Sequence, residues 1–453
     1  MVAGTGSGCG KTSVTCALLD AMKRLKKNVA AFKCGPDYID PMFHRKTTGI
    51  DSFNLDIYLM GIDGVTESLG FHSASRDIAI IEGAMGLYDG IGKGTEASSN
   101  HLARLTKTPT VLVVDTKGKA ASICAEIKGY MNFETNTICG VILNRTKPQM
   151  YAYYKEVIES RCGVTVIGYL PSLPEADIQS RYLGLITVDE IHDVQERIAI
   201  LGDNALKSID FETLFKLAQC EPIQETAERF LKPCTTIYVA QDDAFCFHYA
   251  DNYRMLEAVG AELRFFSPLR DAAIAADADG LIFQGGYPEL YAAQIAANEP
   301  LKIDIRKKHE QGLPIYAECG GFMYMLEHLV DTPGKSHEML GIIPGKSHMT
   351  DRLQQFGYVE LESRNDNILC GKGEKIKAHS FHYSTATNEG NDFSAVKANG
   401  SGSFPCIFAT EKLFAGYPHL HFGGNRQLAA NFVKACTEFR KSINGLHNRS
   451  GGN

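Results

Sequence analysis

The sequence predicts an α/β protein made of two doubly wound parallel-sheet domains, and two observations support this fold class. Short apolar runs, typical of buried strands, alternate with longer helical patterns along most of the chain. Strands joined by helices form parallel sheets that are covered on both faces. The alternation occurs in two series, before and after residues 221–234, and a chain of 453 residues is too long for one compact domain.

The composition is that of a globular protein in water, with 44% hydrophobic and 22% charged residues. A formal charge of −7 provides no general attraction for nucleic acid or for an anionic membrane. Because the sequence has neither a signal peptide nor an apolar run of about 18 residues, we expect a cytoplasmic protein. The thirteen cysteines are scattered without a C-x-x-C pair, which argues against a zinc ribbon or a disulfide framework.

A glycine-rich loop opens the first series, with the sequence Gly-Thr-Gly-Ser-Gly-Cys-Gly-Lys-Thr over residues 4–12 and a helical pattern over 13–25. Backbone N–H groups of such a loop can point at phosphate oxygens, while Lys11 supplies a charge and Thr12 a hydroxyl ligand for Mg²⁺. A chance glycine-rich turn is the alternative, but four glycines in seven residues disfavour it. The expected ATP-binding residues of the loop are Gly4, Thr5, Gly6, Ser7, Gly8, Gly10, Lys11 and Thr12.

Polar residues follow the carboxyl ends of the strands in the first series. A short strand is expected before the loop, and further strands are expected over 28–33, 77–82, 109–114, 137–143 and 164–170. The polar residues past these strands are Asp37, Asp40, Glu82, Asp89 and Asn144. Since parallel sheets bind ligands outside the carboxyl ends of their strands, these residues form a candidate site. Residues 34–41 are expected to be a turn-rich loop, and 188–219 to be helical.

The second series leads to a candidate nucleophile, Cys319. Strands are expected over 235–240, 262–266, 279–283 and 314–317, helices over 249–259 and 322–329, a β-rich part that includes 378–384 and 416–422, and a closing helix over 427–441. Cys319 stands at a strand-to-helix turn before Gly320 and Gly321, which is typical of a nucleophile elbow. A buried structural cysteine is the alternative.

A thiolate nucleophile also needs a base and an oxyanion hole. Either His419 or His421 can be the base, and the N–H groups around Gly285 and Gly286 can line the hole. The two histidines could instead ligate a metal, but no third His or Cys stands at metal-binding spacing. His379 and His382 are interpreted as ordinary polar surface or core residues.

Taken together, these motifs resemble the cobyrinate a,c-diamide synthase family of glutamine-dependent amidating enzymes. The resemblance is carried by residues 4–12, 33–41, 82–90, 180–185, 285–289, 318–321, 349–353 and 419–422. The loop, one residue longer than G-x-x-x-x-G-K-[ST], is similar to that of dethiobiotin-synthetase-like ATP enzymes. The resemblance implies a P-loop NTPase-like, amide synthetase domain over 1–220, a linker over 221–234, a class I glutaminase-like domain over 235–445 and a disordered tail over 446–453.

The resemblance also implies an activity, namely a C–N ligase that amidates the a and c acetate side chains of cobyrinate through acyl phosphates. ATP is the co-substrate, and the expected Mg²⁺ ligands are Thr12, Glu82 and one of Asp37 or Asp40. Asn144 is expected to read adenine, while Asp37, Tyr38, Ile39 and Asp89 border the tetrapyrrole. Cys319 releases ammonia from glutamine with His419 as base. The wider superfamily's triad ends His-x-Glu, but His421 stands in the third place, so no acidic orienter is expected from this motif.

Three alternatives stay open at this stage. The acceptor could be hydrogenobyrinate or nickel-sirohydrochlorin instead of cobyrinate. The chain could also be a P-loop regulatory ATPase with an inactive glutaminase-like domain, although such ATPases carry an extra lysine early in the loop and none lies between Gly4 and Gly10. The expected partners are small molecules rather than nucleic acid or membrane, and a homodimer is a candidate assembly.

Overall fold

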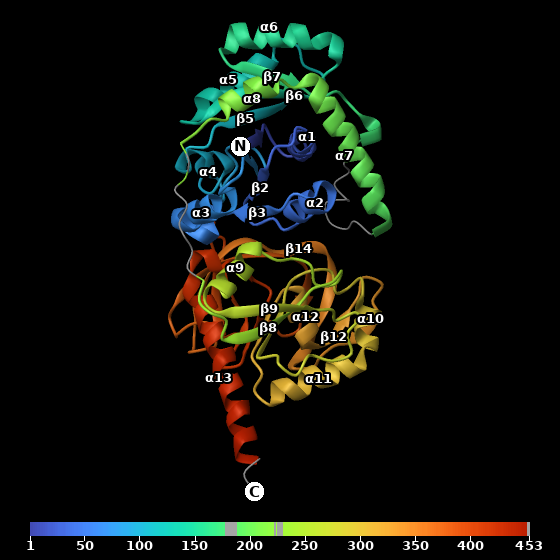
Figure 1. Ribbon diagram of the computed structural model, residues 1–453, viewed down its shortest axis with the longest axis vertical. Coiled ribbons are helices and arrows are strands. Elements are labelled where there is room, and N and C mark those ends of the chain that lie inside the picture. The colour runs from blue at the N-terminus through green and yellow to red at the C-terminus, as the bar shows by residue number, and fades with distance from the viewer. Residues whose placement is uncertain (177–187, 222, 224–229, 451–453) are drawn as a thin grey trace. The chain divides into compact units, whose positions relative to one another are not determined.

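The computed structural model describes residues 1–176, 188–221, 223 and 230–450, which form two compact units (Figure 1). The N-terminal unit comprises residues 1–57 and 61–227, and the C-terminal unit comprises residues 58–60 and 228–453. No helix in the described ranges is long and apolar enough to cross a membrane. All thirteen cysteines are free thiols, and eight of them are buried. The domain limits drawn from the sequence remain predictions.

The N-terminal unit is built around a seven-stranded parallel sheet of order β3-β2-β4-β1-β5-β6-β7. Its strands are β1 Val2–Gly4, β2 Val29–Cys34, β3 Ser52–Leu55, β4 Ile78–Glu82, β5 Thr110–Asp115, β6 Ile138–Asn144 and β7 Thr165–Tyr169. The short β1 lies in the centre of the sheet, where Val2 pairs with Glu82 of β4 and with Val111 of β5. Because all strands are parallel, their carboxyl ends lie along one edge of the sheet.

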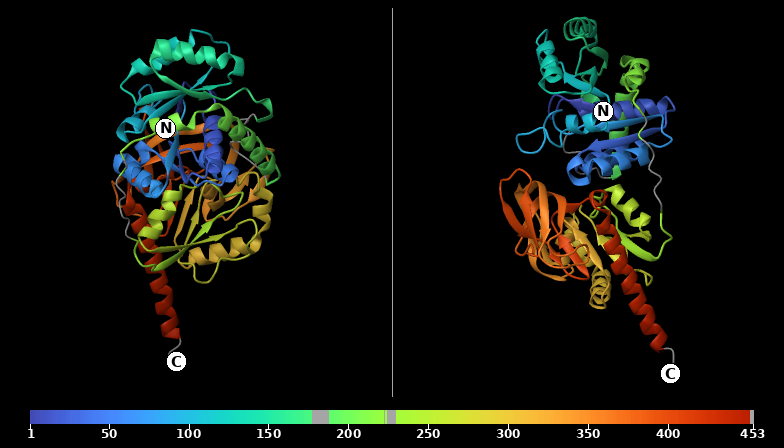
Figure 2. Two further views of the ribbon diagram at one scale, coloured as in Figure 1. Left: turned by 45° about the horizontal axis from the view of Figure 1, so that its top comes forward. Right: turned by 90° about the vertical axis from the view of Figure 1, so that its left-hand side faces the viewer.

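Helices cover both faces of this sheet, as right-handed crossovers between parallel strands require (Figure 2). The helices are α1 Lys11–Arg24, α2 Ile39–Thr48, α3 Ile57–Ser73, α4 Ser99–Leu105, α5 Ile123–Phe133, α6 Tyr151–Cys162, α7 Val188–Ser208 and α8 Phe211–Leu217. α1 and α7 share one apolar core, in which Val14 and Leu18 lie with Val194, Ile198 and Leu201. These residues recur every three or four positions, so each helix buries one face. The helical prediction for 188–219 corresponds to two helices, α7 and α8.

Residues 34–41 are less of a loop than the sequence predicts, because α2 begins at Ile39. The Asp37 Oδ1 atom accepts a hydrogen bond from the Ile39 N–H group at 2.8 Å, which satisfies one of the free donors at the helix start. Pro41 lies in the first turn, where its missing N–H group removes no helical hydrogen bond. The residues interpreted as turn signals are therefore the start signals of a helix.

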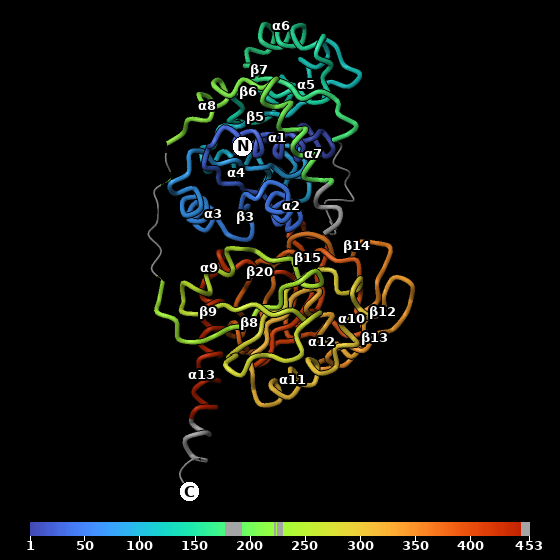
Figure 3. The backbone as a smooth tube through the Cα atoms, turned by 45° about the vertical axis from the view of Figure 1, so that its right-hand side comes forward, coloured from blue at the N-terminus to red at the C-terminus, as the bar shows by residue number. Residues whose placement is uncertain are grey.

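The C-terminal unit contains a six-stranded sheet of order β18-β19-β11-β10-β8-β9 and a second, mainly antiparallel sheet (Figure 3). The first sheet comprises β8 Thr235–Ala240, β9 Ala261–Phe266, β10 Gly280–Phe283, β11 Ile315–Glu318, β18 Phe408–Ala409 and β19 Leu413–Gly416, of which only β18 is antiparallel. The second sheet comprises β12 Leu326–Val330, β13 Ser336–Glu338, β14 Ile343–Ser363, β15 Lys375–Ala386, β16 Phe393–Lys397, β17 Ser403–Cys406 and β20 His419–Leu420. The helices are α9 Ala250–Ala258, α10 Ala292–Ala297, α11 Glu299–Glu310, α12 Gly320–Met325 and α13 Arg426–Ser450. The predicted fold class is confirmed, and the β-rich part of the second half forms a sheet of its own.

The helix predicted over 322–329 is wrong in its second half. α12 ends at Met325, and Leu326 has extended dihedral angles, φ −68° and ψ 171°. From this residue onward the chain pairs with β14 in parallel and with β13 in antiparallel register. The hydrogen bonds of the second sheet therefore override a helical pattern of only a few residues. At the other end of the unit, α13 continues past Lys441, where the closing helix was predicted to stop.

Candidate active sites

The glycine-rich loop connects β1 to α1 and has the backbone that phosphate binding requires. Gly8 and Gly10 have positive φ angles of 76° and 97°, and Gly10 is the N-cap residue of α1. A Cβ atom added at Gly10 would lie 1.9 Å from the Nδ2 atom of Asn144, so no larger residue fits there. The loop thus surrounds the positive end of a helix of 14 residues, which is an anion-binding arrangement.

Lys11 and Asn144 both contact the carbonyl groups of this loop. The Lys11 Nζ atom donates to the Gly6 carbonyl at 2.9 Å, and burial lowers the pKa of Lys11. The Asn144 Nδ2 atom donates to the Cys9 carbonyl at 2.9 Å. Asn144 therefore braces the loop from the end of β6, and its Oδ1 acceptor makes no hydrogen bond with the described part of the chain.

Glu82, the last residue of β4, is fully buried and is the centre of a polar cluster. Its carboxylate accepts hydrogen bonds from the Thr12 hydroxyl at 2.7 Å, from the Lys33 ammonium at 3.2 Å and from the His44 Nε2 atom at 2.8 Å. Burial alone would raise the pKa of Glu82, but Lys33 and His44 outweigh it and hold the pKa well below its usual range. Glu82 is therefore ionised.

Asp40 joins this cluster, while Asp37 caps α2 and lies near enough for its charge to act on Lys33 and Asp40. The buried Asp40 carboxylate forms an ion pair with Lys33, the same ammonium that contacts Glu82. Burial raises the pKa of Asp40, and the charge of Lys33 opposes that rise. Of the two aspartates proposed as alternative metal ligands, Asp40 thus lies with Glu82 and Thr12. Lys33 and His44 were not expected in the site, although a lysine inside an apolar strand is a signal of a buried ion pair.

The donor set of this cluster fits magnesium. Mg²⁺ prefers carboxylate and hydroxyl oxygens and usually keeps waters and substrate phosphates as further ligands. Thr12, Asp40 and Glu82 supply such oxygens next to the phosphate-binding loop. Within the described ranges, no group of three or more His, Cys, Asp or Glu side chains could hold a metal ion by itself, so phosphate oxygens and water would complete the coordination.

A pocket of about 930 Å³ lies beside the loop at the carboxyl ends of β5, β6 and β7. Its lining includes Ser13, Thr116, Lys117, Asn144, Arg145, Pro171 and Pro174. Asn144, which is predicted to bind adenine, therefore lines this pocket and also contacts the phosphate loop through the Cys9 carbonyl. The remaining predicted substrate residues lie along the same edge: Tyr38 and Ile39 at the start of α2, and Asp89 in the loop after β4, where its Oδ2 atom accepts from the Gly86 N–H group at 2.8 Å.

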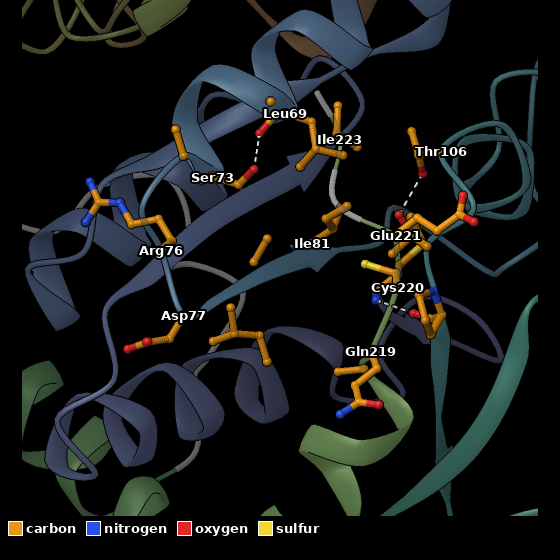
Figure 4. Close-up of a pocket in the computed structure, with 18 of the residues that line it drawn as sticks. Leu69, Ser73, Arg76, Asp77, Ile81, Thr106, Gln219, Cys220, Glu221 and Ile223 are labelled. Atoms are coloured by element: carbon orange, nitrogen blue, oxygen red, sulfur yellow. Dashed lines mark hydrogen bonds between the residues drawn. The ribbon is translucent and has the colours of Figure 1, made fainter. Parts of the chain in front are cut away.

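A second pocket of the N-terminal unit, of about 710 Å³, lies at the opposite, amino-terminal edge of the sheet (Figure 4). Its lining includes Leu69, Arg76, Asp77, Gln219 and Glu221. None of the residues predicted from the sequence to bind substrate or nucleotide lies there. The candidate site is thus at the carboxyl edge alone, where the loop and the buried carboxylates are.

In the C-terminal unit, Cys319 stands in a strained turn between β11 and α12. Its φ and ψ angles are 48° and −104°, a conformation that residues with a Cβ atom rarely adopt. A Cβ atom added at Gly321 would lie 2.3 Å from the Phe283 carbonyl oxygen, and one at Gly320 would lie 2.9 Å from Pro288. The geometry of a nucleophile elbow predicted from the sequence is therefore present, with only 7% of Cys319 exposed.

His419 on β20 lies beside the thiol, whereas His421 does not. Burial would lower the pKa of His419, but the charge of Cys319, a hydrogen bond to it and the nearby Glu318 carboxylate raise the pKa to about 10. His421 instead packs against Tyr249 with ring centroids 4.7 Å apart, and its Nδ1 atom accepts from the Gly423 N–H group. Of the two candidate bases, only His419 has the required position.

The loop with Gly285 and Gly286 adjoins both the elbow and the base. A Cβ atom added at Gly285 would lie 2.9 Å from the His419 Cε1 atom, and one at Gly320 would lie 3.2 Å from the Gly286 backbone nitrogen. Gly286 has a φ angle of 158°. These close approaches bring the loop of Gly285 and Gly286 next to both the elbow and His419.

Two further histidines surround this site, and one carboxylate was missed. His379 pairs with His419 across β15 and β20, and His382 stacks on Tyr417 with ring centroids 3.9 Å apart. Both are buried, so their interpretation as core residues holds and that as surface residues does not. The missed residue is Glu318, whose Oε2 atom lies 3.4 Å from the His419 Nδ1 atom. Its only sequence signal is its place directly before Cys319.

The motif over residues 180–185, one of those that carry the family resemblance, lies outside the described residues.

Comparison with known proteins gives the same two-part organisation. The model of the CobQ/CobB/MinD/ParA nucleotide binding domain matches residues 1–183, and that of the CobB/CobQ-like glutamine amidotransferase domain matches residues 236–427. A cobyrinate a,c-diamide synthase of Fusobacterium nucleatum is 39% identical over 446 residues, which cover 94% of this chain and 97% of the relative. The enzymes of that name from Clostridium tetani and Priestia megaterium are 39% and 38% identical and match 97% of this chain, with 99% and 97% of their own length covered.

The buried histidines of the C-terminal unit should make it sensitive to acid. Burial lowers the pKa of His421 to about 4, below its ordinary value of 6.5. Between pH 6.5 and 4 the unfolded chain then binds a proton that the folded chain excludes, so the free energy of unfolding falls as the pH falls through this window. For His421 the loss amounts to about 3 kcal/mol. The free energy of unfolding can be measured with denaturant at pH 7 and at pH 4. The difference between the two values should be smaller in His421→Gln than in the wild type by that amount.

The exposed His328→Gln variant is the control for the loss of a histidine as such. An unchanged pH dependence in His421→Gln would contradict the assignment of a neutral buried imidazole.

Proposed function

Because the chain belongs to the cobyrinate a,c-diamide synthase family, we propose that it amidates the a and c acetate side chains of cobyrinate, with ATP and glutamine as co-substrates. It is a C–N ligase with glutamine as the amido donor, and it has an ATP-using nucleotide-binding domain. The observation that carries the proposal is the presence of two reaction centres in one chain: a phosphate loop beside a buried carboxylate cluster, and a thiol elbow beside a histidine.

Amide formation requires activation of the acid, because a carboxylate is a poor electrophile and hydroxide is a poor leaving group. In the proposed first step a carboxylate oxygen of the acetate attacks the γ-phosphorus of ATP, the bond from this phosphorus to the bridging oxygen breaks, and ADP leaves. The loop N–H groups and Lys11 would hold the phosphates in line for this transfer. Ammonia then attacks the acyl phosphate and releases inorganic phosphate.

Magnesium, when bound, neutralises charge that develops on the transferred phosphoryl group. Thr12, Glu82 and Asp40 would hold it through their oxygens. His44 orients Glu82, since its two ring nitrogens contact the Glu82 carboxylate and the Ser52 hydroxyl at 2.8 and 3.1 Å. The pocket next to Asn144 would take the adenosine part of the nucleotide, with the Asn144 Oδ1 atom as an acceptor for the adenine amino group. Asp37, Tyr38, Ile39 and Asp89 would border the macrocycle.

Ammonia is proposed to come from glutamine hydrolysis at Cys319. The thiolate attacks the side-chain amide carbon, and the N–H groups of Gly285 and Gly286 stabilise the oxyanion. His419 gives its proton to the leaving nitrogen, so that ammonia departs and a thioester remains. Water then attacks the thioester, and glutamate and the thiol are released.

Removal of the nucleophile should separate the two half-reactions. Cys319→Ala should lose glutamine-driven amidation by at least about 10³-fold, because Cys319 supplies the thiol that lies beside His419. The same variant should retain ammonia-driven amidation, since the phosphate loop is untouched. Product mass after incubation with cobyrinate, ATP and either nitrogen source measures both activities. Parallel incubations with hydrogenobyrinate and nickel-sirohydrochlorin test the alternative acceptors, and loss of both half-reactions in the variant would contradict the division of labour.

A side chain at position 10 should impair phosphate binding by the glycine-rich loop. In Gly10→Ala the new methyl group meets Asn144, and alanine at a φ angle of 97° costs about 1–2 kcal/mol. We expect ATP affinity to fall at least about 10-fold in titration calorimetry with Mg²⁺ present. Gly129→Ala is the matched control, because Gly129 lies in α5 and a Cβ atom there meets nothing within 4 Å. Equal ATP affinity in the Gly10 and Gly129 variants would refute the assignment of the loop.

A further inference from the structure

A buried carboxylate stands directly before the nucleophile. Glu318 is the last residue of β11, is only 3% exposed and precedes Cys319 in the chain. Its Oε2 atom lies 3.4 Å from the Nδ1 atom of His419. Its Oε1 atom accepts a hydrogen bond from the Leu420 N–H group at 2.7 Å and another from the Tyr316 hydroxyl.

These contacts hold the Glu318 carboxylate in one orientation. Tyr316 is itself fixed, because its ring is buried and stacks on Phe414 with centroids 5.3 Å apart and planes 7° apart. The Leu420 N–H group adjoins His419 in the chain, so the carboxylate bridges the nucleophile strand β11 and the base strand β20. With Oε1 engaged twice, Oε2 is the oxygen that faces the imidazole.

A carboxylate at Nδ1 has two effects on a catalytic histidine. It selects the ring in which Nδ1 carries hydrogen, which leaves Nε2 to accept a proton from the thiol. It also stabilises the imidazolium that forms when the proton arrives. Glu318 is among the groups that raise the pKa of His419, together with Cys319 and against the effect of burial.

The position two residues after His419 cannot do this. It holds His421, whose Nδ1 atom is bound to the Gly423 N–H group and whose ring packs on Tyr249. The acid that orients the base is therefore supplied from the nucleophile strand instead of the base strand.

We propose that Glu318 is a positioning residue of the glutaminase site, which holds the His419 imidazole by its Nδ1 atom so that Nε2 serves Cys319. The inference rests on the proposed function of this site as a glutaminase. Tyr316 supports it indirectly, by fixing the Glu318 carboxylate.

The test is Glu318→Gln, which keeps the size of the side chain and removes its charge. Glutamine hydrolysis in the full-length enzyme should lose about 10²–10⁴-fold in kcat, with the KM for glutamine changed less than threefold, because the substrate pocket is intact. Ammonia-driven amidation should stay at the wild-type rate. The control is Asp331→Asn, since Asp331 also binds a histidine, with 2.7 Å between its Oδ2 atom and His337 Nε2, but outside the site. This control should hydrolyse glutamine like the wild type.

A pH profile separates positioning from a merely structural role. Within the described part of the chain, the titratable groups that face His419 include Cys319, Glu318, His379 and His382, and Glu318 is the carboxylate of this set. Without its charge, the high-pH limb of kcat/KM should move to lower pH. Tyr316→Phe keeps the charge of Glu318 but removes one hydrogen bond to its carboxylate. This variant should lower kcat by a smaller factor and should leave the high-pH limb of kcat/KM in place.

The outcomes distinguish the two levels of the proposal. A wild-type kcat and an unshifted profile in Glu318→Gln would overturn the role of Glu318 while the glutaminase assignment stands. Loss of ammonia-driven amidation would show that Glu318→Gln does not fold. In that case Tyr316→Phe is the deciding variant, and wild-type glutamine hydrolysis in it would overturn the positioning role of Glu318. Absence of glutamine hydrolysis in the wild type would refute the proposed function itself.

Discussion

Both units depend on the same constraint: a carboxylate buried at the carboxyl end of a parallel strand must have its charge paired. Glu82 ends β4 and Glu318 ends β11, and each contacts a histidine from another element, His44 or His419. An unpaired buried charge costs several kcal/mol, so these partners stabilise the folded chain. The same contacts fix the orientation of the carboxylates, which is what a metal ligand and a base-orienting group each need.

The strand-to-helix turns at Gly10 and at Cys319 both adopt a positive φ angle, but with different residue types. At Gly10 the chain adopts a positive φ angle without a side chain, so that backbone N–H groups remain accessible to phosphate. At Cys319 it adopts a positive φ angle with a side chain, which is strained but lifts the thiol out of the strand. Gly320 and Gly321 pack closely against Pro288 and the Phe283 carbonyl group, where a larger residue would not fit.

Most strands of the two parallel sheets could be predicted from the sequence, because their short apolar runs are buried in the sheet. β8 was predicted with its observed bounds, whereas the strand before the glycine-rich loop is nearly missing from the sequence pattern and is present as the three-residue β1. Elements whose secondary structure depends on pairing with strands far away in the sequence could not be predicted. β12 continues a short helical pattern but pairs with β14 in the second sheet, and the four-residue edge strand β3 contains Ser52 and Asn54, which leaves too few apolar residues for it to be recognised.

The sequence by itself determined which residue types carry the chemistry: the glycine spacing around Lys11, the acids past the strand ends and the small residues around Cys319 are local patterns with local physical reasons. Only the tertiary structure showed which of two neighbouring candidate residues lies at a site when the sequence could not distinguish them. It placed Asp40 in an ion pair with the lysine that contacts Glu82, and it placed His419 rather than His421 beside the thiol. Glu318 became visible only in the fold, because its partners stand about a hundred residues away and meet it across a sheet.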